Sequence, residues 1–92
     1  MTRIVVRELV WDEWNLKHIE KHKVAKEEIE QASEIIYHRK THGGKYLATG
    51  RSGKRLITII LRRKGLGKYY LVTARDASKK ERMKVYEKEG KK

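Results

Sequence analysis

Basic side chains and a phenol gather near the end of the chain, in a pattern suited to contact with a phosphodiester. Residues 69–86 (YYLVTARDASKKERMKVY) predict a strand, a break that carries Arg75, and then a helix. Ser78 and Glu81 have the spacing of a capping box, which sets where the helix begins. These two elements would hold five candidate side chains near one end of a sheet: Arg75, Lys79, Lys80, Arg82 and Tyr86. The free N–H groups of a helix N-terminus also attract anions, which strengthens the case for a phosphate-binding region.

Other arginines lie at the ends of predicted strands. Arg51 ends one strand and Arg75 ends another, and in an antiparallel meander these two ends point the same way. We therefore expect Arg51 and Arg75 to converge near the helix N-terminus. Arg62 and Arg63 end the intervening strand at its opposite end, so they are expected to form a separate basic patch.

Exposed aromatic residues would add stacking surfaces for nucleic-acid bases. Trp14, on the first predicted helix, and Tyr86, on the last, are the best candidates for exposure. Trp11, Tyr46 and Tyr70 are expected in the core.

A metal site finds little support in the histidines. His18 and His22 are four residues apart, which places them on one face of a helix, but the acid between them is in the wrong position for the H-E-x-x-H zinc motif. Carboxylate ligands are also scarce, since only Asp12 and Asp76 are aspartates. We expect no metal: His18 is interpreted as solvated and His22 as bonded to backbone at the helix end. A role in RNA contact or proton transfer is the alternative.

Other reaction types lack their motifs. The segment Gly65-Leu66-Gly67 lies between two predicted strands, which indicates a hairpin turn and not a nucleotide loop. The glutamates lie mainly among lysines on helix faces, and no serine stands in a nucleophile elbow. Cysteine is absent, which excludes thiolate chemistry and disulfides. No cofactor is expected.

Length and charge narrow the class of protein. The 92 residues predict one domain, 1–92, with a small core. The formal charge of +12, from 24 basic and 12 acidic residues, favours a polyanion, most commonly nucleic acid. The same positive charge would also attract an acidic protein or an anionic membrane surface. No apolar run is long enough to span a bilayer and the N-terminus lacks a secretory h-region, so a cytoplasmic location is expected.

The sequence pattern predicts an α+β fold in the order β-α-α-β-β-β-α. Strands are expected at 3–11, 45–50, 55–63 and 69–74, with a possible extra short strand at 37–40. Helices are expected at 13–22, capped by Asp12 with Trp11 packed on Leu16, at 26–36 with Ile36 on its apolar face, and after Ser78. We expect an antiparallel meander with the helices packed on one face.

Two blocks of this sequence resemble a known family. The first is residues 11–24 (WDEWNLKHIEKHKV); the second combines residues 46–51 (YLATGR), residues 72–75 (VTAR) and the basic helix that ends in Tyr86. Their order and spacing resemble the BrnT family of type II toxin–antitoxin toxins, relatives of the RelE-like ribonucleases, over residues 9–87. Lys23, Ala25 and Asp76 depart from residues common in that family.

The resemblance implies a RelE-like fold and an endoribonuclease that blocks translation without a metal ion, neutralised in a hetero-oligomer by a cognate DNA-binding antitoxin. In such enzymes the RNA 2′-hydroxyl attacks its own phosphate. By this analogy Arg75 clamps the scissile phosphate, Arg51 assists, and His22 or Tyr86 carries the proton. The remaining RNA contacts would come from Lys79, Lys80, Arg82, Arg63 and Trp14.

A second interpretation is a non-catalytic module. The same charge and aromatic residues would serve a basic domain that grips RNA, or an inactive toxin homologue that only binds its partner. A purely structural interaction domain is the third possibility.

Overall fold

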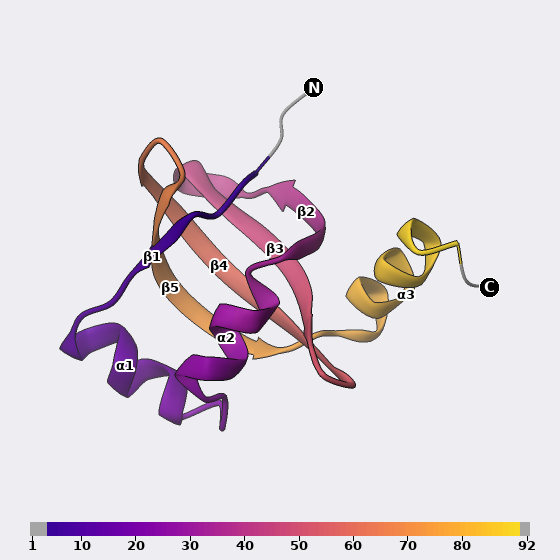
Figure 1. Ribbon diagram of the computed structural model, residues 1–92, viewed down its shortest axis with the longest axis horizontal. Helices are drawn as coiled ribbons and strands as arrows, with labels where there is room; N and C mark the ends of the chain where they lie inside the picture. The colour runs from indigo at the N-terminus through magenta and orange to yellow at the C-terminus, as the bar shows by residue number, and fades with distance from the viewer. Residues whose placement is uncertain (1–3, 91–92) are drawn as a thin grey trace.

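The computed structural model describes residues 4–90. In chain order the elements are β1 (Glu8–Val10), α1 (Glu13–Glu20), α2 (Lys26–Ala32), β2 (Ile35–Lys40), a 3₁₀ turn η1 (His42–Gly44), β3 (Lys45–Ser52), β4 (Arg55–Gly65), β5 (Lys68–Asp76) and α3 (Lys79–Lys88) (Figure 1). The predicted α+β class is confirmed. The possible short strand at 37–40 is a full strand, β2, so four strands follow α2 and not three.

The five strands form one mixed sheet in the order β1-β5-β4-β3-β2. Strands β2 to β5 make the expected antiparallel meander, but β1 pairs with β5 in parallel. The prediction of a purely antiparallel sheet is therefore wrong at this edge. From β1 the chain passes through α1 and α2 to β2 at the far edge of the sheet, and then returns strand by strand. The last strand, β5, therefore lies beside β1 and runs in the same direction.

Helix α2 is shorter than predicted, because its end meets the sheet. A side chain at Gly50 of β3 would collide with the carbonyl oxygen of Ala32, which shows how closely the helix end approaches the strand. Ser33 closes the helix, and Ile35 and Ile36 continue as strand β2. Two adjacent β-branched residues suit a strand better than a helix. The assignment of Ile36 to the inner face of a helix was therefore wrong.

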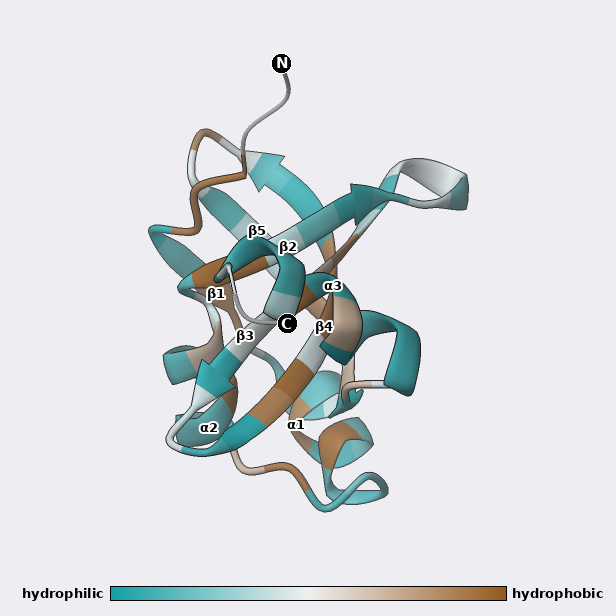
Figure 2. Ribbon diagram, turned by 90° about the vertical axis from the view of Figure 1, so that its right-hand side faces the viewer, coloured by the Kyte–Doolittle hydropathy of each residue, from teal (hydrophilic) through white to brown (hydrophobic). Residues whose placement is uncertain are grey.

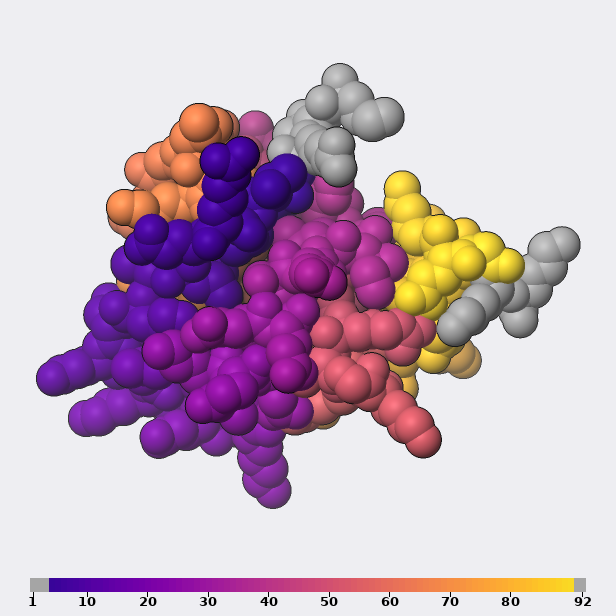
Figure 3. All heavy atoms as spheres, viewed as in Figure 1, coloured from indigo at the N-terminus to yellow at the C-terminus, as the bar shows by residue number. Residues whose placement is uncertain are grey.

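The main core lies between one face of the sheet and the first two helices. Ile19 and Ile29 from the helices join Ile57, Ile59 and Leu61 of β4 in one buried cluster. In the view of Figure 1, α2 lies in front of the sheet, and the space-filling view shows the N-terminal segment and these helices covering most of that face (Figures 1 and 3). Strand β4 carries the apolar stretch LITIIL, predicted to be central, and its hydrophobic residues are brown in Figure 2.

Helix α3 packs on the opposite face. A second small cluster joins Val85 of α3 to Leu56 of β4 and to Ala77. Because side chains alternate along a strand, Leu56 and its neighbour Ile57 point to opposite sides of the sheet. The expectation that all helices cover one face is wrong for α3, which covers only one end of its face.

The rest of that second face carries no helix, and we call it the open face. Register pairs Lys45 with Arg62 and Thr58 with Arg75, and alternation places these side chains on the face of Leu56. Among residues 4–90, no helix is long and apolar enough to cross a membrane.

Strand β5 and helix α1 differ from the prediction at single positions. Tyr69 is buried in the main core, whereas Tyr70 is only half-buried and lies on the open face opposite Arg62. A register shift between the Ile60 and Leu61 pairs changes which β5 residues point inward. On α1, Leu16 is 38% exposed. Asn15 is fully buried instead.

Candidate nucleic-acid interface

Arg75 is held on the open face by a buried carboxylate. Its Nη1 and Nη2 atoms donate to Glu81 Oε1 and Oε2, both at 2.9 Å. Glu81 is only 7% exposed and also accepts from Ser78 N and Thr58 Oγ1, each at 2.8 Å. The Thr58 hydroxyl lies 2.8 Å from that of Thr49. Arg75 is thus oriented by a network that joins three strands to the first turn of α3.

The charge of Glu81 is stabilised despite its burial. Burial alone would raise the pKa of this carboxyl, but the hydrogen bonds from Arg75, Ser78 and Thr58 lower the pKa to about 2. The sequence predicted Glu81 as a capping residue, and the capping box with Ser78 is confirmed. The sequence analysis missed its second role as the partner of Arg75, because no local spacing rule connects a residue at the end of a strand with one in the helix that follows the loop.

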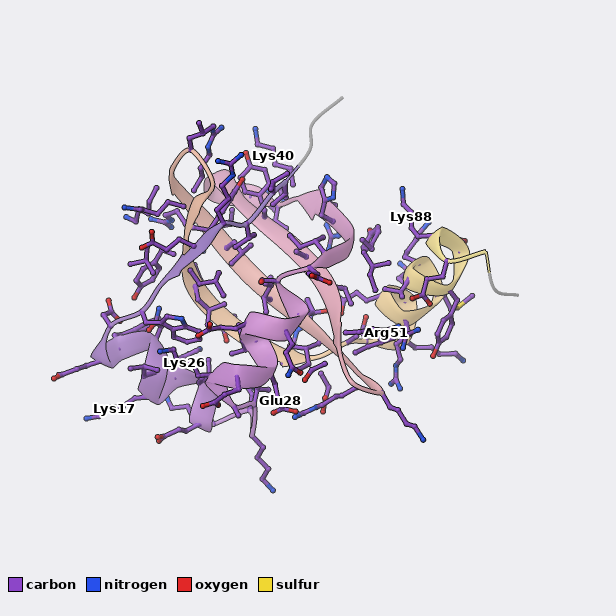
Figure 4. All side chains as sticks on the ribbon, viewed as in Figure 1. Lys17, Lys26, Glu28, Lys40, Arg51 and Lys88 are labelled. Atoms are coloured by element: carbon purple, nitrogen blue, oxygen red, sulfur yellow. The ribbon has the colours of Figure 1, made fainter. Side chains whose placement is uncertain are left out.

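Arg51 is held at the other end of α3. Its Nε and Nη2 atoms donate to Glu89 at 2.9 and 2.7 Å, and these hydrogen bonds raise the pKa of Arg51. In Figure 4 its side chain extends from β3 toward α3. Glu81 is in the first turn of α3 and Glu89 is its C-cap, which separates them by roughly 12 Å along the helix. Arg51 and Arg75 therefore do not converge on one anion as predicted.

The charge of Asp76 is balanced by Arg55 and not by its neighbour Arg75. Arg55 Nε donates to Asp76 Oδ1 at 2.7 Å, and its Nη1 donates to both carboxylate oxygens of Glu28 at 2.9 Å. The hydrogen bond from Arg55 lowers the pKa of Asp76. Arg55 also donates to the carbonyl of Lys23, so it joins β4 to α2 and to the turn between α1 and α2. No local sequence pattern indicates this role, because the partners of Arg55 are 21 and 27 residues away.

The basic residues of α3 are divided between two sides of the helix. Lys80 and Lys84 line a hollow of about 160 Å³ with Tyr37 and Arg39. Arg82 and Tyr86 line another, of about 310 Å³, with Lys54, Arg55, Leu56, Asp76 and Ala77. Successive residues turn by about 100°, so residues 80 and 82 face nearly opposite directions. Lys79 is exposed at the first helical position, and the predicted cluster is thus not one patch.

Three aromatic side chains, from α1 and the turn that follows it, contact one another in a row. Trp14 is 56% exposed and stacks on His18, with ring centroids 4.8 Å apart and planes 10° apart. His18 contacts His22 edge-on at 5.7 Å. Within the described residues, no group of three or more histidine, aspartate or glutamate side chains is arranged to hold a metal ion.

Trp14 also borders a basic hollow at the far end of the open face from α3. The hollow, of about 250 Å³, is lined by Trp14, Lys45, Arg62, Lys64, Tyr70 and Val72. We call it the Trp14 hollow. Arg63 lies elsewhere, in a hollow with Val5, Arg7, Leu66, Gly67 and Tyr69, so it contributes neither to the Trp14 hollow nor to the region around α3.

A comparison with solved structures identifies the fold. The chain superposes on the crystal structure of the Brucella abortus ribonuclease toxin BrnT with a TM-score of 0.62, over 78% of this chain and 97% of that one. The fold is BrnT-like. The two sequences are 22% identical, so the likeness speaks for the fold alone. No protein-family profile matches the sequence, and no curated protein has significant similarity to it.

The BrnT-like fold agrees with the fold that the sequence resemblance implied. The first block of the resemblance, residues 11–24, forms α1 and the turn that follows it. Residues 72–75 of the second block lie at the end of β5. Both blocks border the open face, through Trp14 and Arg75 respectively.

Proposed function

We propose that this chain is a toxin of a type II toxin–antitoxin system, an endoribonuclease that cleaves RNA without a metal ion and blocks translation. A cognate DNA-binding antitoxin would bind and neutralise it in the cytoplasm. The observation that carries the proposal is an oriented arginine, Arg75, on an open basic sheet face of a BrnT-like fold. The charge of +12 supports RNA as the substrate.

Arg75 keeps donors available for a phosphate. A guanidinium group has five N–H donors. Two bind Glu81 and a third, on Nη1, binds the Asp76 carbonyl at 3.1 Å. The remaining two, on Nε and Nη2, lie along one edge and form a fork that matches two phosphate oxygens. The Arg75 side chain is 39% exposed, so this edge can be reached from solvent.

The proposed reaction is an internal transesterification. The RNA 2′-oxygen forms a bond to the neighbouring phosphorus as the bond to the 5′-oxygen breaks, and a proton passes from the 2′-hydroxyl to the leaving oxygen. The fork of Arg75 would stabilise the charge that builds on the non-bridging oxygens. Arg51, at the other end of α3, would assist by holding a flanking phosphate, as would Lys79, Lys80 and Arg82. His22 or Tyr86 would carry the proton.

The test is RNA cleavage in the presence of EDTA by the wild type and by Arg75→Ala, together with growth arrest on expression. Cleavage by the wild type and its loss in the variant are expected. Intact RNA with the wild type, or equal cleavage by both proteins, would overturn the proposal.

One observation favours a second candidate, a non-catalytic RNA-binding module or inactive toxin homologue. Both Arg51 and Arg75 are ion-paired with carboxylates, which lowers the net charge at each. This candidate predicts salt-sensitive RNA binding without cleavage under the same conditions.

A further inference from the structure

We propose that the Trp14 hollow is a binding site for one unpaired RNA base and its phosphate. The inference rests on the proposed function in taking RNA as the substrate, and it names how a nucleotide away from the cleaved bond would be held. The hollow combines two aromatic rings and Val72 with three cations, Lys45, Arg62 and Lys64. At about 250 Å³ it is smaller than sites for drug-sized ligands, which span roughly 300–1,000 Å³, and so suits a single flat ring.

The indole of Trp14 presents one face to a ligand. His18 stacks almost parallel on the indole at 4.8 Å and does not line the hollow. His18 therefore covers one face of the indole, and the opposite face is left for a base that enters the hollow. A base entering the hollow can continue the stack as a third layer, which is how proteins commonly hold unpaired bases.

Both aromatic rings are held by the start of α1. Asp12 caps the helix by accepting from Asn15 N at 2.9 Å, and it accepts the Tyr70 hydroxyl at 2.9 Å. The Asn15 side chain donates to the carbonyls of Val10 and Leu71, where β1 and β5 separate. One buried amide and one carboxylate thus fix the helix that carries Trp14 against the strand that carries Tyr70. A site built in this way loses little freedom when a base binds.

The cations of the hollow are arranged for an anion and not for stability. Lys45 and Arg62 stand directly opposite each other on β3 and β4, and like charges in that position destabilise a sheet. Within residues 4–90, neither these two nor Lys64 forms an ion pair with a carboxylate. The Lys64 ammonium lies 5.8 Å from the centre of the Tyr70 ring. A phosphate between the three cations would relieve their repulsion.

The hollow is on the same face and the same strand as Arg75. Tyr70 and Arg75 are both on β5, roughly 16 Å apart at the rise of an extended strand. One extended RNA strand along the open face can therefore reach both, with the bound base some nucleotides from the cleaved bond.

The test measures affinity for a single-stranded oligonucleotide with 2′-O-methyl groups, which cannot be cleaved by its own 2′-oxygen. Trp14→Ala should weaken binding about 10- to 100-fold, and Trp14→Phe should retain most of the affinity because it keeps a stacking ring. Met83→Ala is the matched control, since Met83 is 55% exposed on α3 and should leave affinity unchanged. The exposure of Trp14 means that its replacement should leave the fold, followed by circular dichroism, intact.

An abasic oligonucleotide of the same length separates base from phosphate recognition. The wild type should bind the abasic oligonucleotide as weakly as Trp14→Ala binds the oligonucleotide with bases. Trp14→Ala should bind the abasic oligonucleotide with the same affinity as the wild type does. Equal loss with the two oligonucleotides, or unchanged affinity of Trp14→Ala, would overturn the assignment. So would a poly-glutamate probe that depends on Trp14 as strongly as RNA does, because the hollow would then bind acidic protein. Trp14-dependent RNA binding without cleavage would keep this site while the proposed nuclease activity fails; cleavage with no Trp14 dependence would do the reverse.

Discussion

The arginines around α3 and the cations of the Trp14 hollow share one sheet face but differ in their partners. Arg51 and Arg75 each form hydrogen-bonded ion pairs with carboxylates of α3 and its C-cap. Lys45 and Arg62 face each other without such partners in the described chain. Paired arginines are held in fixed orientations with reduced net charge, which suits stabilisation of a transition state. Unpaired cations contribute more to attraction at long range, which suits capture of RNA.

The largest effect should come from the oriented arginine. Arg75→Ala is expected to reduce the single-turnover rate of RNA cleavage by about 10²–10³-fold, because it removes the donors aimed at the phosphate. Arg75→Lys should recover little, since an ammonium cannot form the fork. Arg7→Ala is the control, because Arg7 is an exposed arginine in the separate hollow beside Gly67, and this variant should cleave at nearly the wild-type rate. A similar loss in both alanine variants would show that charge alone matters and would remove the distinction between the two regions.

Removing the charge of Glu81 should be the largest effect on stability. Glu81→Gln is expected to lower the free energy of unfolding by about 1–3 kcal/mol in urea denaturation, because a buried hydrogen-bonded charge pair is broken. The partly exposed position of Arg75 keeps the value below that for a fully buried pair. Glu89→Gln at the other end of α3 should lower the free energy of unfolding by less than about 1 kcal/mol, since the Glu89 side chain is 22% exposed against 9% for Glu81. Equal losses would mean that burial does not distinguish the two pairs.

Acid should weaken the same network. The pKa of Glu81 is about 2 in the folded state against 4.5 for the free side chain, so its stabilisation is present above about pH 4.5 and is lost as pH falls toward 2. The free energy of unfolding should fall over this range by on the order of 2 kcal/mol more in the wild type than in Glu81→Gln. Parallel pH curves for the two proteins would contradict the assigned pKa.

The smallest expected effect is on the salt dependence of RNA affinity, which should distinguish the Trp14 hollow from the region around α3. Lys45→Ala and Arg62→Ala should each reduce the dependence of log affinity on log salt by up to about one, as expected for one lost phosphate contact. Both variants should fold at least as stably as the wild type, because each removes one member of a like-charge pair. Arg51→Ala should change the salt dependence less, because its charge is matched by Glu89. The reverse order would place RNA capture at α3.

Local features of the molecule could be predicted from the sequence. Asp12 and Ser78 begin their helices as expected, each with a capping box, because capping depends on residues within one turn. The central position of β4 followed from its apolar run. Trp14 was predicted to be exposed, and it is, because it does not lie on the face of α1 that carries the buried Ile19.

Other features of the candidate interface required the tertiary structure. The partners of Arg75, Arg55 and Arg51 are 6, 21 or 27, and 38 residues away, and nothing in the local pattern selects one glutamate among many. The sequence pattern singled out Arg51 and Arg75 and showed Asp76 only as a departure from the family that it resembles. The structure shows that Arg55 binds Asp76, so Arg75 is left with Glu81.

The sequence by itself determined the α+β class, the caps of α1 and α3, the overall charge and an arginine at the end of β5. Tertiary structure alone decided that α3 packs on the face opposite α1 and α2, and that Trp14 reaches the open face beside Tyr70. The physical reason is the range of the interactions. Caps and periodicity arise within a few residues, whereas the choice of sheet face, the edge position of β1 and the pairing of buried charges depend on segments that meet only when the whole chain has folded.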